Sequence, residues 1–158
     1  MKKFMITLMA ILLPFGIYAQ RHQEVNWKNI IQQVTAEKEF KVDIRQVIPR
    51  VGQTLTPTSP YSIEVNNDIL ISQLPYIGRA TNIAYGGGEG LNFTAPIKGY
   101  ETVLTRNNRL TLTFRAKSSD DSFTYTLIIF DNGNVSMTVQ GINRESISFT
   151  GEIILPKK

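Results

Sequence analysis

The chain has 158 residues, of which 42% are hydrophobic and 19% charged, and its formal net charge is +4. This length and composition fit one globular domain with a hydrophobic core of its own. The chain has no cysteine. Disulfide bonds, thiolate metal ligands, cysteine nucleophiles and lipid attachment through an N-terminal cysteine are therefore excluded.

The first 19 residues have the pattern of a cleaved export signal. Lys2 and Lys3 precede an apolar run over 4–16, and Ala19 precedes a polar stretch. The alternative is a membrane anchor, but the apolar run is shorter than the roughly 20 residues that span a bilayer. We predict a signal peptide over 1–19, a periplasmic or secreted mature chain, and no membrane span after cleavage.

Cleavage would remove two of the 17 basic residues and leave 15 against 13 acidic ones, a net charge of +2. These basic residues are scattered singly, without the clustering or interleaved aromatics that a phosphate backbone demands. We expect no nucleic-acid partner.

The mature chain, 20–158, is expected to form one domain that begins with an amphipathic helix at about 24–38. Val25, Ile30, Ile31 and Val34 recur at helical spacing, and the stretch contains no proline or glycine. We expect the only tryptophan, Trp27, to anchor this helix on the β structure that follows.

Apolar and polar residues then alternate with a period of two, which is typical of half-buried strands. Turn-forming residues separate these strands, and Asp131-Asn132-Gly133 is the strongest hairpin signal. We expect Pro75 to end the strand that carries Leu74, and Gly151 to mark a bulge or bend. About nine strands are predicted, over 40–48, 61–66, 69–74, 91–93, 98–105, 109–117, 123–130, 135–140 and 147–155.

Short sequential hairpins favour an antiparallel meander, and a sheet of eight to nine strands tends to close. We therefore predict a mainly β protein with an up-and-down barrel and one N-terminal helix. The alternative of a transmembrane barrel is disfavoured, because the outward faces are rich in polar and charged residues.

The glycine run Gly86-Gly87-Gly88-Glu89-Gly90 predicts a mobile loop. A phosphate-cradling loop would need a helix after it, but Leu91-Asn92-Phe93 reads as a strand.

Three blocks of sequence carry a family resemblance. They are Leu74-Pro75-Tyr76-Ile77-Gly78-Arg79, Gly90-Leu91-Asn92-Phe93 and Asn143-Arg144-Glu145-Ser146-Ile147-Ser148-Phe149-Thr150-Gly151. In order and spacing they resemble the exported Bacteroidetes family called domain of unknown function 4251, from about Trp27 to Ile154. Ile77 stands where that pattern has an aromatic residue, and Phe149 where it has tyrosine. The resemblance implies a lipocalin-like β-barrel and export, and it implies no activity.

Few residues offer catalytic or metal-binding chemistry. The only histidine, His22, lies ahead of the helix, so neither a serine-type triad nor a histidine zinc site is expected. Asp120-Asp121 lies in a predicted hairpin, where we expect a solvated turn. We predict no catalytic residues, no metal, no cofactor and no enzymatic activity.

Four residues are candidates for ligand binding: Tyr76, Arg79, Glu89 and Arg144. Both arginines follow a glycine-containing breaker near a strand end, where barrels present their mouths. One hypothesis is that they offer a guanidinium fork to a carboxylate or phosphate of a ligand. The alternative, which we favour, is that they hydrogen-bond loop carbonyls and fix the glycine-rich loop.

Three functions remain open at this point. The first is a lipocalin-like binding module for a small apolar or amphipathic molecule, and an interior filled by its own side chains would argue against it. The second is an envelope interaction or structural module with a solid barrel and an exposed apolar patch. The third is an enzyme, which would need a pocket combining Tyr76 and Arg79 with Glu89, Glu101 or Asp43.

Overall fold

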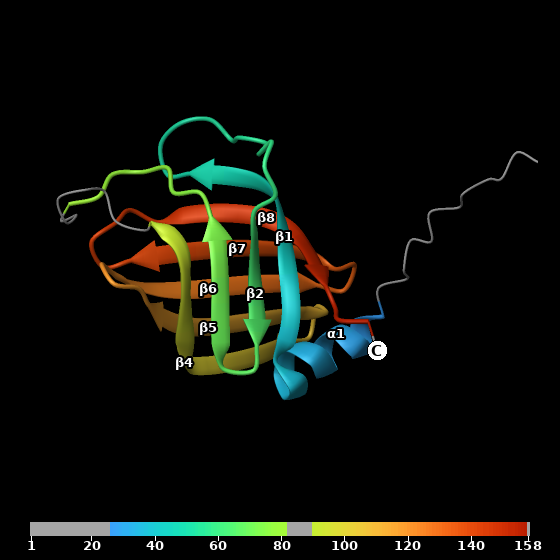
Figure 1. The fold of residues 1–158 in the computed structure, drawn as a ribbon. Helices are drawn as coiled ribbons and strands as arrows, with labels where there is room; N and C mark the ends of the chain where they lie inside the picture. Colours follow the sequence, from blue (N-terminus) through green and yellow to red (C-terminus); the bar gives the residue numbers. More distant parts are fainter. Residues whose placement is uncertain (1–25, 82–89, 158) are drawn as a thin grey trace, which may run out of the picture.

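The computed structural model describes residues 26–81 and 90–157 and shows a closed barrel of eight strands (Figure 1). Each strand is antiparallel to the next in the chain, and β1 pairs with β8 to close the barrel. The strands are β1 (Glu39–Pro49), β2 (Ser62–Asn66), β3 (Ile69–Leu74), β4 (Leu91–Thr105), β5 (Arg109–Lys117), β6 (Ser122–Phe130), β7 (Asn134–Gly141) and β8 (Ile147–Ile154). The predicted mainly β, up-and-down architecture is confirmed.

The strand count is eight rather than nine because β4 is a single strand of 15 residues. The sequence pattern predicted two strands there, over 91–93 and 98–105. Gly99 has a φ of +63°, and the ladder between β4 and β5 shifts register between Lys98 and Glu101. A bulge of this kind bends a strand without ending it.

The helix is shorter than the predicted 24–38. Within the described residues, α1 (Trp27–Gln32) starts after Asn26, whose side chain accepts a hydrogen bond from the Lys28 N–H at 3.0 Å. It continues into a π-helical turn, η1 (Gln33–Glu37), and ends at Lys38 with a φ of +52°. Trp27 packs against the core, as predicted.

The helix packs at the end of the barrel where β1 begins, which we call the helix end (Figure 1). Ile30 and Val34 are fully buried. The Tyr100 hydroxyl donates a hydrogen bond to the Val34 carbonyl at 2.6 Å, and the Lys38 ammonium lies 5.0 Å from the centre of the Tyr100 ring. The Tyr100 side chain of strand β4 therefore holds the end of the helix.

The opposite end, which we call the loop end, carries the connections 50–61, 75–81, 118–121 and 142–146. These connections share one end because alternate turns of an up-and-down barrel lie on the same side. The ladder partner of Leu74 is Leu91, so β3 ends at Leu74 before Pro75, as predicted.

Aromatic side chains stack through the barrel interior. The ring of Phe114 lies 5.1 Å from that of Tyr125 and 6.1 Å from that of Tyr100. The buried Tyr125 hydroxyl donates to the Ser72 hydroxyl at 3.1 Å, which in turn donates to the Leu91 carbonyl at 2.7 Å. The interior residues Phe114, Tyr125, Leu127, Met137 and Phe149 are each at most 1% exposed. These side chains line the interior, which in an eight-stranded barrel is just wide enough for side chains to fill.

A β-bulge lies opposite Gly151, in β1 between Ile44 and Gln46. A Cβ atom at residue 151 would lie 2.2 Å from the backbone oxygen of Asp43. Only glycine fits this close approach of two strands, so the predicted irregularity at Gly151 is confirmed. Among the described residues, no helix is both long and apolar enough for a transmembrane span.

Candidate functional site at the loop end

Two connections at the loop end pair with each other like short strands. Ala80 and Arg144 form an antiparallel β-bridge. The Thr81 N–H donates to the Asn143 carbonyl at 2.9 Å, and the Glu145 N–H donates to the Arg79 carbonyl at 3.1 Å. The segment 79–81 after β3 is thereby fixed to the connection between β7 and β8.

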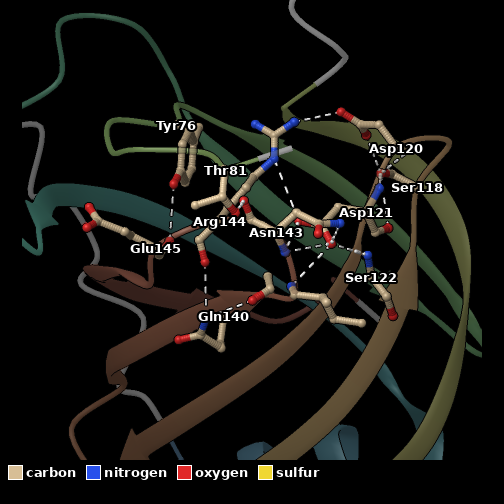
Figure 2. Close-up of polar contacts among 12 residues, drawn as sticks. Tyr76, Thr81, Ser118, Asp120, Asp121, Ser122, Gln140, Asn143, Arg144 and Glu145 are labelled. Carbon is tan, nitrogen blue, oxygen red and sulfur yellow. Dashed lines mark hydrogen bonds and ion pairs between the residues drawn. The ribbon is translucent and has the colours of Figure 1, made fainter. Parts of the chain in front are cut away.

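Tyr76 reinforces this pairing through its hydroxyl group. Its hydroxyl donates to the Arg79 carbonyl at 2.8 Å. The same hydroxyl lies 3.3 Å from the Glu145 carbonyl (Figure 2). Burial raises the pKa of Tyr76, so the phenol remains a neutral donor at physiological pH. A Cβ atom at Gly78 would lie 2.8 Å from the Tyr76 hydroxyl oxygen, which explains the glycine.

Arg144 is the centre of the cluster. Its Nη2 donates to Oδ2 of Asp120 at 2.6 Å, and its Nε lies 3.8 Å from Oδ2 of Asp121 (Figure 2). The guanidinium carbon lies 5.1 Å from the centre of the Tyr76 ring. The side chains of Arg144, Asp120 and Asp121 are only 5%, 10% and 1% exposed, so the ion pairs are shielded from water.

Asp121 also fixes the backbone of the next connection. Its carboxylate accepts the N–H groups of Ser122 at 2.8 Å, Ile142 at 3.2 Å and Asn143 at 3.2 Å. A Cβ atom at Gly141 would lie 2.7 Å from its Oδ2, so glycine gives the carboxylate room. One side chain thus joins the connection 118–121 to the connection 142–146.

Asp120 is held on its other oxygen by Ser118, whose hydroxyl donates to Oδ1 at 2.6 Å. This hydrogen bond, together with the Arg144 charge, keeps the pKa of Asp120 below its ordinary value despite partial burial. The predicted turn at Asp120-Asp121 is confirmed, but the expectation that it is solvated was wrong. The fold brings Arg144 over both carboxylates, and this pairing permits their burial.

The four residues predicted to bind a ligand have different surroundings. Tyr76 and Arg144 lie together in the cluster just described. Arg79 is exposed, and the contacts that it makes with other described residues are made by its backbone. Glu89 lies outside the described residues. The Arg144 guanidinium is buried, but it bonds the Asp120 carboxylate rather than the loop carbonyls of the favoured alternative, and 86–89 of the glycine run lie outside the described residues.

The sequence interpretation did not connect Asp120 and Asp121 with Arg144. The topology held a usable signal, because 118–121 and 142–146 follow alternate turns of a meander and must share one barrel end. The side-chain pairing itself could not be predicted from the sequence, because it depends on how far each connection folds over the end of the barrel.

The charged groups of the cluster pair with one another. Arg144 bonds to Asp120, and its Nε lies 3.8 Å from Asp121. Within residues 26–81 and 90–157, no group of three or more histidine, aspartate or glutamate side chains is placed to hold a metal ion. Asp43, one of the carboxylates considered for a catalytic pocket, pairs with Lys41 on β1 at 2.9 Å.

Comparison with known proteins identifies the family but no activity. No curated protein matches the chain significantly. The crystal structure of a DUF4251 family protein from Bacteroides eggerthii is similar in fold, with a TM-score of 0.63 and 20% sequence identity, over 84% of this chain and 89% of that one. The model of the family described as domain of unknown function (DUF4251) matches residues 21–153. The chain therefore belongs to the DUF4251 family.

Proposed function

We propose that this protein is a non-catalytic interaction module that holds a partner protein of the cell envelope on the loop end of its barrel. A lipocalin-like module would instead carry a small apolar or amphipathic molecule inside the barrel. Five side chains that would have to leave room for such a molecule are buried in the interior, and the rings of Phe114 and Tyr125 stack there with 5.1 Å between their centres. This packing favours a binding surface on the outside of the barrel over a binding cavity inside it.

The buried ion pairs support the proposal because they are an inefficient way to stabilise a fold. The free-energy cost of removing two charges from water offsets most of the attraction between them. They are, however, effective at fixing one geometry. Arg144, Asp120 and Asp121 fix three connections relative to one another, and a surface that is already ordered loses less entropy when a partner binds.

The observation that carries the proposal is the position of Ile142. Its backbone N–H is held by the buried carboxylate of Asp121, yet its side chain is 78% exposed. Val51 on the first connection is equally exposed, and Ile77 and Leu55 are 38% and 45% exposed at the same end. Of these residues, Ile142 and Ile77 lie on connections that the cluster fixes. Large apolar side chains presented from ordered loops are typical of protein-binding surfaces.

The cellular setting is part of the proposal. The signal-peptide pattern over 1–19 supports export, and we expect the mature protein in the periplasm or outside the cell. Fractionation of the native organism with an antibody against the mature chain tests this expectation directly. Recovery in the cytoplasm at full precursor mass would contradict it.

Site-specific photocrosslinking in intact cells tests the interaction. A photoreactive amino acid at residue 142 should give a discrete adduct with a second protein. The matched control is the same amino acid at Val103, which is 59% exposed on β4 near the helix end. Absence of an adduct at 142, or equal adducts at both positions, would overturn the proposal.

A further inference from the structure

A second surface, on the outside of the barrel, has the chemistry of an anion-binding site. A groove of about 520 Å³ lies along the end of β5, between β4 and the start of β6. Its lining residues are Pro96, Lys98, Arg115, Ala116, Lys117, Ser118 and Ser122. We propose that this groove binds a phosphate group carried by a small molecule or a lipid headgroup.

The arrangement of cations in the groove is unfavourable without a counter-charge. Lys98 and Arg115 are directly opposite partners on neighbouring antiparallel strands, so both side chains project from the same face. Lys117 is two residues beyond Arg115 and shares that face. Like charges opposite each other destabilise a sheet, and a bound anion would remove that penalty.

The protein itself supplies no such anion in the described part of the chain. No ion pair joins Lys98, Arg115 or Lys117 to a described carboxylate, and all three are exposed. No lining residue is acidic. The nearby Asp120 carboxylate is occupied by Arg144 and Ser118.

The bulge in β4 shapes the groove around Arg115. A Cβ atom at Gly99 would lie 3.2 Å from Nη2 of Arg115, so the guanidinium lies against glycine backbone that no side chain covers. The planar guanidinium can then give two parallel hydrogen bonds to one oxyanion, while the lysines act as point charges. The hydroxyl of Ser122 adds a neutral donor.

Phosphate is the oxyanion that best matches this set of donors. It carries close to two negative charges at neutral pH and has three oxygens free to accept hydrogen bonds. The volume of the groove falls within the range of small-molecule sites, so it has room for more than the phosphate group alone.

Titration with inorganic phosphate at constant ionic strength tests the site, with backbone amide NMR shifts as the readout. We expect saturable shifts at residues of the groove. Arg115→Gln should weaken the affinity about tenfold, as loss of a charge-assisted hydrogen bond predicts. The matched control is Arg109→Gln, which makes the same charge change at the other end of β5, where the guanidinium lies 5.5 Å from the Phe130 ring.

Vesicles that contain phosphatidic acid, whose headgroup is a phosphate monoester with three free oxygens, form the second arm and distinguish the two sources of phosphate. If the protein binds the vesicles, and Arg115→Gln weakens that binding while Arg109→Gln does not, the ligand is a lipid headgroup. If the protein binds inorganic phosphate saturably but does not bind the vesicles, the ligand is a soluble phosphate. Non-saturable shifts, equal losses in both variants, or no binding to either probe would overturn the proposal. Unchanged thermal unfolding of both variants shows that any loss is local.

Discussion

At the scale of single residues, the loop end is organised by a buried arginine and two buried carboxylates. Arg144 bonds to Asp120, and Asp121 bonds to backbone amides of the connection that carries Arg144. Each member depends on the others, because a single buried charge without its partner is far more costly than the complete set. Substitutions here should therefore have large effects.

Arg144→Ala should lower the free energy of unfolding by about 3–5 kcal/mol, because it leaves two buried carboxylates without their counter-charge. Urea denaturation monitored by circular dichroism measures the change. Arg79→Ala is the matched control, since that arginine is exposed and should change stability by less than about 0.5 kcal/mol. Similar losses in the two variants would contradict the role assigned to Arg144.

Asp120 should contribute acid sensitivity. Because its pKa is lower in the folded state than in the unfolded chain, its contribution to stability is present above the unfolded pKa and is lost as the pH falls through the folded pKa. Asp120→Asn should therefore be clearly less stable than the parent at about pH 6, with a smaller difference at about pH 3. Urea denaturation at the two values checks this, and a constant difference would refute it.

Gly151→Ala should lower stability by about 3 kcal/mol or prevent folding, because its methyl group would overlap the backbone oxygen of Asp43. Thr94→Ala, on an exposed position of β4, is the control and should be nearly neutral. Thermal unfolding of the purified variants makes the comparison. A stable Gly151→Ala protein would show that the approach of β1 and β8 is looser than described.

At the scale of elements, the short helix is a lid on the helix end rather than an independent unit. Isolated helices of this length are marginal in water, so its stability comes from packing. Ile30 and Val34 supply the apolar contact, and the hydrogen bond from Tyr100 satisfies the Val34 carbonyl inside a π-helical turn. The hydrogen bond between Tyr100 and Val34 thereby joins the helix to strand β4.

Tyr100→Phe should cost about 1 kcal/mol, because it leaves that carbonyl without its partner. Hydrogen exchange should quicken in 27–37 while the strands remain protected. Tyr61→Phe is the control, since no hydrogen bond of its hydroxyl is seen among the described residues and its ring also packs against the core. Unchanged exchange in the helix of Tyr100→Phe would contradict this account of the docking.

At the scale of the whole molecule, much of the architecture was predictable from local signals. The period-two alternation and turns such as Asp131-Asn132-Gly133 reflect sterics of short segments, and they led to the correct meander. The long strand β4 was divided in the prediction, which left 94–97 outside both strands. In the structure the strand continues through Pro96, which pairs with Ile69, and bends at the bulge beside Gly99.

The candidate site was less predictable because it depends on contacts between distant residues. Tyr76 and Arg144 were selected from their positions beside breakers, and the structure does bring them together. Asp120 and Asp121 were assigned to a solvated turn, since local turn chemistry carries no information about burial by another connection. Their interaction with Arg144 arises only once the barrel closes.

The central claim is that the Arg144 cluster holds the loop end in the form that binds a partner. Photocrosslinking from residue 142 should be compared in the parent protein and in Arg144→Met, after circular dichroism has shown that the variant barrel is folded. We predict that the variant loses most of the adduct, because its connections are no longer fixed. An undiminished adduct in the folded variant would contradict the claim.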